Sequence, residues 1–171
     1  MRHSRVAVSG LCYGQLDVPL AASFPAEAEA LRADLQQRFG QHLPPIWSSP
    51  SQRCLQLAQT LHPQVRLEPR LLELSFGDWE GQRWEQLDGP AARHWGDNWQ
   101  SARPPGGETL AELLARLQAF LAELSAPDAL LVTHAGPIRC LQHLLGGVSL
   151  ERAFGQPVPC ASLLQLPWPD A

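Results

Sequence analysis

The stretch of residues 129–133, Ala-Leu-Leu-Val-Thr, constrains the fold of this chain more than any other segment. Its apolar side chains occupy consecutive positions, so an extended strand formed here is apolar on both of its faces. Strands of this kind lie inside a parallel sheet that helices cover on both sides. Shorter strands are expected at residues 45–49, 65–68 and 163–166. The sequence therefore predicts an α/β protein with a mostly parallel central sheet.

Helical segments alternate with these strands. Leu31, Leu35 and Phe39 recur every four residues and predict a helix over 26–39, and a second helix is expected over 51–62. Between the later elements, a long segment rich in Trp, Gly and Pro is expected to form a helical and looping excursion. Such an excursion can cap a pocket, whereas for each single Trp plain packing is the favoured role. This segment spans residues 79–105.

The strongest helical pattern covers residues 109–124. Thr109 is expected at its N-cap, and Glu112 three residues later completes a capping box, in which each side chain bonds the other's backbone N–H. The apolar side chains recur with helical spacing and form one stripe that faces the core. They are Leu110, Leu113, Leu114, Leu117, Phe120, Leu121 and Leu124.

The composition limits the class of protein. A length of 171 residues is close to the usual size of one domain, so we expect a single domain over 1–171. Charge or proline interrupts every leucine-rich stretch before the roughly 18 apolar residues of a membrane span, and no secretory signal follows the first basic residues. A cytoplasmic protein is expected. The mild net charge of -4 predicts no nucleic-acid or membrane partner, and the oligomeric state stays open.

Cysteine and lysine usage excludes several kinds of site. The four cysteines lie far apart without a CxxC pair, which fits neither a zinc site nor a disulfide framework. All thirteen basic residues are arginine, so the chain has neither the lysine of a phosphate-binding loop nor one for a Schiff base. Any anion site must therefore be built from arginine, histidine and backbone N–H groups.

Two strand-to-helix turns share one design. In residues 46–53, an apolar strand ends in serine, proline begins a helix, and Arg53 lies in the first turn. In residues 131–139, a strand ends at His134 and Pro137 stands near the next helix start. Taken singly, Arg53 is as well explained by a surface ion pair and His134 by a core position. Together, at the carboxyl ends of strands and beside helix N-termini, they favour an anion site, with phosphate as the best match.

The sequence also limits which group could attack phosphorus. No cysteine has the arginine six positions later that cysteine phosphatases need, because Val18, Thr60, Gly146 and Leu166 stand at those positions. The six histidines form no HExxH or similar metal-binding cluster. A histidine nucleophile remains, and neither a metal nor another cofactor is expected.

Five segments in sequence order resemble motifs of the histidine phosphatase superfamily, also called phosphoglycerate mutase-like. They are Arg2-His3, the Ser-Ser-Pro-x-x-Arg segment of 48–53, the acid-bearing loop of 72–81, the segment of 103–108 before the long helix, and the Thr-His-x-Gly segment of 133–136. The resemblance extends from Arg2 to about Leu145. It implies a three-layer α/β/α sandwich and a phosphomonoesterase that works through a phosphohistidine.

The resemblance also implies a role for each matching residue. His3 is the expected nucleophile, and His134 is expected to stabilise the transition state, either protonated or by donating one N–H. Glu73 is the expected general acid and base, with Glu80 and Glu85 as nearby rivals. The phosphate ligands implied are Arg2, Arg53 and Ala135, whereas Arg139 is interpreted as structural.

Within the superfamily, residues 11–20 and the Phe-Gly-Asp-Trp-Glu-Gly run are similar to alpha-ribazole phosphatases, which remove a 5′-phosphate late in cobalamin biosynthesis. This similarity predicts alpha-ribazole 5′-phosphate as the small-molecule substrate. Two alternatives stay open. One is a phosphatase of other small esters such as sugar phosphates, and the other is an inactive phosphate-binding module.

Two departures from the family pattern bear on activity. Ser4 stands where the family usually has glycine, a small difference that we expect to be tolerated. The family also places a central strand before Arg2-His3, where this sequence offers only Met1. Either the natural start lies upstream, or residues 5–9 are recruited, or the sheet lacks that strand. If the strand is missing, we expect a weakened or inactive catalyst, and restoring upstream residues should give normal activity. A phosphatase assay that compares the two forms tests this expectation.

Overall fold

The computed structural model describes residues 1–126 and 128–167, and a parallel sheet lies at its centre. Three strands, β1 (Ile46–Ser48), β2 (Val65–Leu67) and β3 (Leu130–Val132), pair in the order β2-β1-β3. Both pairings are parallel, with Trp47 of β1 opposite Arg66 on one side and Leu131 on the other. The predicted α/β fold with a parallel central sheet is confirmed.

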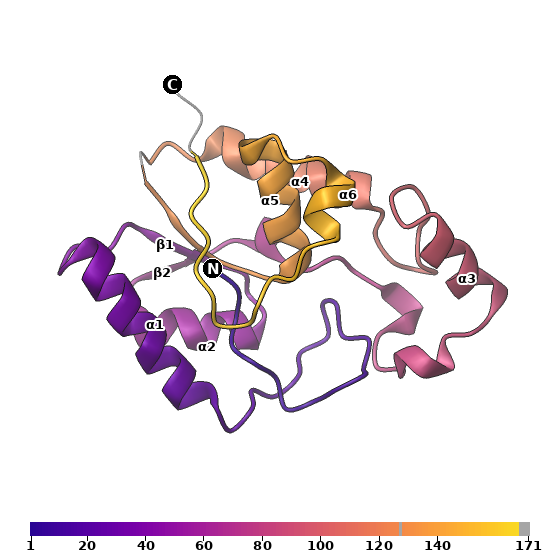
Figure 1. Ribbon diagram of the computed structural model, residues 1–171, viewed down its shortest axis with the longest axis horizontal. Helices are drawn as coiled ribbons and strands as arrows, with labels where there is room; N and C mark the ends of the chain where they lie inside the picture. Colours follow the sequence, from indigo (N-terminus) through magenta and orange to yellow (C-terminus); the bar gives the residue numbers. More distant parts are fainter. Residues whose placement is uncertain (127, 168–171) are drawn as a thin grey trace.

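Helices cover both faces of this sheet (Figure 1). On one face, α1 (Phe24–Phe39) and α2 (Gln52–Leu61) pack against the sheet. Their core cluster includes Ala28, Leu31, Leu35, Leu57, Ala58, Ile46 and Val132. On the other face lie α4 (Leu110–Glu123), α5 (Ala135–Gly146) and α6 (Leu150–Phe154). That cluster includes Trp47, Leu71, Leu113, Leu117, Phe120 and Cys140. The molecule therefore has the predicted three layers.

The long helix α4 begins as its sequence predicts. The Thr109 side chain accepts a hydrogen bond from the Glu112 N–H, and the Glu112 carboxylate accepts one from the Thr109 N–H. Four side chains of the predicted stripe, Leu110, Leu113, Leu117 and Phe120, are buried. The capping box and the core-facing stripe are confirmed.

The expected strand at residues 163–166 is wrong. Backbone pairing with the N-terminal segment occurs earlier, where the Ala161 N–H donates to His3 and the Arg2 N–H donates to Ser162. Ala161 has φ of 51°, a left-handed conformation that interrupts an extended chain. The following leucines form no ladder, and Leu164 is 40% exposed.

The N-terminal residues lie beside β3. The Thr133 N–H donates to Met1, and the His3 N–H donates to Thr133, so Arg2 and Thr133 form one parallel bridge. Residues 5–9 do not take the place of a strand here, because Val6 pairs with Leu20 in a separate antiparallel bridge. The alternative in which residues 5–9 are recruited is therefore wrong.

The excursion after β2 is helical and looping, as predicted. It contains the short 3₁₀ turns η1 (Pro69–Leu71), η2 (Gly77–Trp79) and η3 (Trp84–Gln86), followed by α3 (Pro90–Asp97). Aromatic rings hold it together, since Trp95 lies 5.6 Å from Phe76, 5.8 Å from Trp79 and 6.3 Å from Trp84 between ring centroids. None of the helices in the described residues is both long enough and apolar enough to cross a membrane.

Candidate active site

Two histidines meet at the carboxyl edge of the sheet. His3 follows the bridge at Arg2, and His134 follows β3 as the N-cap of α5. Their ring centroids are 5.2 Å apart, and their exposures are 2% and 0%. Both imidazoles therefore share one buried environment at the edge where ligands of open α/β sheets bind.

The backbone fixes the tautomer of His3. Its Nδ1 lies 2.7 Å from the carbonyl oxygen of Ser4, and a carbonyl can only accept a hydrogen bond. Nδ1 must therefore carry the proton. In the neutral ring, Nε2 then holds the free lone pair that a nucleophile needs.

His3 is neutral near pH 7. Its pKa is lowered from 6.5 to about 3, and burial is the largest cause. The hydrogen bond to Ser4 opposes this shift, and the nearby Arg53 and Arg2 guanidiniums add smaller lowering effects. The positive charge of the guanidiniums disfavours protonation of the ring. The larger cause is desolvation, which penalises the charged form of a ring that is 2% exposed.

His134 is held by the serine that follows β1. Its Nε2 lies 2.8 Å from the Ser49 hydroxyl oxygen, and the Cys54 sulfur is 3.5 Å from the same nitrogen. The Ser49 oxygen accepts a hydrogen bond from the Ser51 N–H. Burial first, and then Arg53 and His3, lower the pKa of His134 well below its usual range. Of the two states that the sequence left open, the structure favours the neutral ring, which donates one N–H.

Arg53 lies beneath the loop that follows the N-terminal segment. It is fully buried, and its two terminal nitrogens donate to the Leu16 and Gly14 carbonyls at 2.9 and 2.6 Å. Its guanidinium also lies 5.2 Å from the centre of the Tyr13 ring. Its third nitrogen, Nε, is buried and has no partner among the described residues. This donor fits an anion, because among residues 1–126 and 128–167 no carboxylate approaches the guanidinium closer than Asp17 at 3.9 Å.

Arg2 offers a second donor of the same kind. One terminal nitrogen donates to the Val158 carbonyl, and its Nε is likewise buried without a partner in the described part of the chain. Ala135 begins α5, so its N–H belongs to the first helical turn, whose N–H groups have no acceptor within the helix. Positive charge and helix donors thus surround the two imidazoles, an arrangement that favours a phosphoryl group.

The Glu73 carboxylate contacts the first turn of α5, the helix that His134 caps. It accepts from the Leu74 N–H at 2.9 Å and from the Gly136 N–H at 3.2 Å. A methyl group on Gly136 would lie 2.1 Å from a Glu73 oxygen, so only glycine allows the carboxylate so near. The glycine of the Thr-His-x-Gly segment therefore makes room for Glu73 two residues from His134.

The rival carboxylates have other surroundings. Glu80 accepts hydrogen bonds from the backbone N–H groups of Gln15, Leu16 and Phe76, so it ties two loops together. Glu85 is exposed and lies 3.9 Å from the exposed Arg83. Of the three candidates, the geometry favours Glu73 as the acid beside the histidines.

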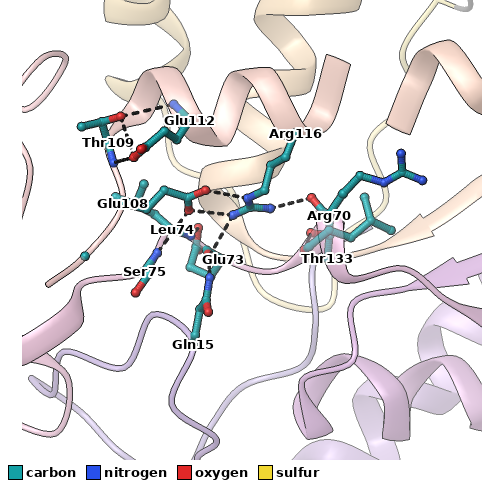
Figure 2. A network of polar contacts seen from close by, with 12 residues as sticks. Gln15, Arg70, Glu73, Leu74, Ser75, Glu108, Thr109, Glu112, Arg116 and Thr133 are labelled. Atoms are coloured by element: carbon teal, nitrogen blue, oxygen red, sulfur yellow. Dashed lines mark hydrogen bonds and ion pairs between the residues drawn. The ribbon is translucent and has the colours of Figure 1, made fainter. Parts of the chain in front are cut away.

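A polar network holds the loop that carries Glu73 (Figure 2). Arg116 of α4 donates to the carbonyls of Arg70 and Glu73 and forms an ion pair with Glu108. From the opposite side, the Gln15 side chain donates to the Glu73 carbonyl. Arg116 was not among the site residues predicted from the sequence, although a charged residue beside the apolar stripe of α4 is a signal for a buried polar contact.

A cavity of about 580 Å³ adjoins Glu73 and Gly136. Four aromatic residues, Phe76, Trp95, Trp99 and Phe154, form part of its walls. Arg139 also lines the cavity, and its Nε is buried without a partner among the described residues. One of its terminal nitrogens donates to the Gln156 carbonyl at 3.1 Å. The sequence interpreted Arg139 as structural, whereas it borders the same cavity as Glu73.

The fold and this cluster together are typical of an α/β enzyme that acts on phosphate esters. Comparison with known proteins identifies the class further. The model of the histidine phosphatase superfamily (branch 1) matches residues 1–170, and the chain belongs to this family. It is accordingly a phosphoric monoester hydrolase.

Several relatives share most of the chain. Phosphoserine phosphatase 1 of Hydrogenobacter thermophilus is 29% identical over 85% of this chain and 74% of its own. The adenosylcobalamin/alpha-ribazole phosphatase of Escherichia coli is 28% identical over 88% and 79%. The crystal structure of the alpha-ribazole phosphatase from Shigella flexneri has a TM-score of 0.84, with 28% identity, and covers 94% of this chain and 85% of its own.

A third kind of relative is a mycobacterial glucosyl-3-phosphoglycerate phosphatase, whose structure in complex with VO3 has a TM-score of 0.78 at 30% identity. It covers 91% of this chain and 84% of its own. The names of these relatives refer to three different phosphate esters, so the family identifies the reaction class and leaves the substrate to be established.

Proposed function

We propose that this chain hydrolyses a phosphate monoester without a metal ion, through a phosphohistidine on Nε2 of His3. In the first step the Nε2 lone pair attacks phosphorus, and the bond from phosphorus to the ester oxygen breaks. The departing oxygen takes its proton from the carboxyl group of Glu73. Nδ1 keeps its proton, so the phosphorylated ring is cationic and remains hydrogen-bonded to the Ser4 carbonyl.

The second step returns the enzyme to its starting state. The Glu73 carboxylate takes a proton from water, whose oxygen attacks phosphorus, and the phosphorus–nitrogen bond breaks with its electrons returning to Nε2. Arg2, Arg53 and the Ala135 N–H bind the phosphoryl oxygens in both steps. His134 donates one N–H to the charge that develops on those oxygens.

One observation carries the proposal: the buried His3 has its Nδ1 held against the Ser4 carbonyl, and the nearby Arg2 and Arg53 each have a buried Nε donor without a partner in the described residues. The test is to mix the protein with ³²P-labelled p-nitrophenyl phosphate and quench during turnover. We expect acid-labile label on the protein, and none on His3→Ala. His42→Ala is the control, because His42 is exposed and the variant should trap label normally. Absence of label from the unmodified protein, with phosphate still released, would exclude the phosphohistidine.

For the substrate, we propose alpha-ribazole 5′-phosphate. Two observations support it: the relatives include alpha-ribazole phosphatases, and the cavity beside Glu73 has aromatic walls that suit a flat apolar group on the leaving alcohol. A panel of esters tests this assignment by kcat/KM. We expect alpha-ribazole 5′-phosphate to exceed phosphoserine and ribose 5-phosphate by at least about 10-fold, since burying one aromatic group contributes a few kcal/mol.

Phosphoserine is the second candidate substrate. It is favoured by the 29% identity with phosphoserine phosphatase 1, which is as high as the identity with the alpha-ribazole enzyme. The same panel separates the two substrates. The aromatic residues of the cavity would favour alpha-ribazole 5′-phosphate, which has an aromatic group, and would give phosphoserine no advantage over other esters without one. Phosphate binding without turnover of any ester in the panel would instead indicate an inactive phosphate-binding module.

A further inference from the structure

A largely buried ion pair between Arg116 and Glu108 contacts the loop that carries the proposed acid, Glu73. The Arg116 Nε lies 2.7 Å from one oxygen of Glu108, and Nη2 lies 2.9 Å from the other. The two side chains are 18% and 15% exposed. This two-point contact fixes the plane of the guanidinium, which leaves its remaining N–H groups pointing in defined directions.

These remaining groups bind the main chain on both sides of the proposed acid (Figure 2). Arg116 Nη1 donates to the Arg70 carbonyl at 2.5 Å, and Nη2 donates to the Glu73 carbonyl at 3.1 Å. Glu108 contributes from its own side, since its N–H donates to the Ser75 carbonyl at 2.9 Å. Its carboxylate accepts from the Ser75 N–H at 3.4 Å.

The loop needs such contacts because it has no regular structure of its own. Residues 73–76 lie between the 3₁₀ turns η1 and η2 and belong to neither a helix nor a strand. Their position therefore depends on hydrogen bonds from neighbouring elements. A displacement of about 1 Å in a catalytic group is enough to slow a reaction roughly 100-fold.

We propose that Arg116, oriented by Glu108, is a positioning residue for Glu73. By holding the carbonyls of Arg70 and Glu73, it keeps the Glu73 carboxylate against the Gly136 N–H, in the first turn of the helix that His134 caps. The inference rests on the proposed role of Glu73 as the acid. It adds that α4, which supplies no group to the phosphate site, sets the position of that acid.

The test uses leaving groups that differ in their need for a proton. The p-nitrophenolate ion is stable, so its ester needs little acid catalysis, whereas an alkoxide leaves only when protonated. We compare kcat/KM for p-nitrophenyl phosphate and for an alkyl phosphate. Glu73→Gln and Arg116→Met should lower the value for the alkyl ester at least 10-fold more than the value for the aryl ester. Glu108→Gln should act in the same direction with a smaller ratio.

Arg103→Met is the matched control. Arg103 also pairs with a glutamate of α4, Glu112, at 2.7 Å and donates to a backbone carbonyl, that of Gly107, at 2.9 Å. Among the described residues it forms no hydrogen bond or ion pair with the 70–75 segment, so the ratio of the two esters should not change.

The outcomes separate the inference from the function it rests on. If Glu73→Gln shows the selective loss while Arg116→Met and Glu108→Gln reduce both esters equally or neither, the positioning role is wrong and the acid role stands. If Glu73→Gln itself shows no selectivity, the acid assignment in the proposed function is wrong. Should Arg116→Met fail to fold, the milder Glu108→Gln variant decides the matter, because it keeps the size of the side chain.

Discussion

At the scale of single residues, burial determines the chemistry of the candidate site more than charge does. His3 and His134 lie beside two guanidiniums, yet the main reason that each ring has a lowered pKa is its removal from water. A nucleophilic imidazole must be neutral, and the site provides this state well below pH 7. Because burial does most to keep the rings neutral, the positive charge of the arginines is available to bind the phosphoryl oxygens.

Gly136 gives a prediction at this scale. Gly136→Ala should lower kcat for an alkyl phosphate about 10-fold or more, because the new methyl group would occupy the space of a Glu73 oxygen. The Tm should stay the same or rise, since alanine favours a helix over glycine by up to about 1 kcal/mol. Gly146→Ala is the control on the same helix, where the methyl group meets its nearest neighbour at 3.8 Å. Unchanged turnover in Gly136→Ala would show that Glu73 tolerates displacement.

The sequence predicts those site residues that end strands or begin helices. His134 and the serines before Arg53 follow apolar strands directly, so the parallel sheet alone brings them to one edge. Arg116 is different, because its partners Arg70 and Glu73 are distant in sequence and are recognised only once the loop is folded against α4. Hydrogen bonds from a side chain to a distant carbonyl leave no spacing pattern in the sequence.

At the scale of elements, α4 offers a prediction that is independent of catalysis. Thr109→Ala should reduce the free energy of unfolding by about 1 kcal/mol, because it removes the acceptor for the Glu112 N–H at the first turn. Urea denaturation measures this difference. Thr109→Ser keeps the hydroxyl and should recover most of the loss. An alanine variant as stable as the original chain would mean that the capping box contributes little here.

The strands show where a local pattern stops being informative. Each confirmed strand is a residue or two shorter than predicted, because the continuous pairing of β1 with β2 and with β3 covers only three residues on each side. The expected strand at 163–166 fails for a different reason. Apolar residues form a strand only beside a paired neighbour, and the N-terminal segment pairs with Ala161 and Ser162 instead. Such long-range pairing cannot be read from the apolar pattern of either segment.

At the scale of the whole molecule, the site makes the fold sensitive to acid. In the folded chain, His3 has a pKa of about 3, whereas in the unfolded chain an exposed histidine has a pKa near 6.5. Between these values unfolding takes up a proton, so the free energy of unfolding falls as the pH falls below 6.5. Above that pH the contribution of His3 to stability is fully present. The buried His134 acts in the same direction.

Stability should therefore decrease between pH 7 and pH 5.5, a range above the region where carboxylates titrate. For His3 alone the loss is roughly 1.3 kcal/mol, and His134 adds to it. Urea denaturation at the two pH values measures the difference. His3→Gln removes one titrating ring and should make the dependence less steep, whereas His42→Gln, which changes an exposed ring, should leave it as it is. Equal stability of the original chain at both pH values would mean that the two imidazoles take up protons in the folded chain. That result would contradict the neutral nucleophile on which the mechanism depends.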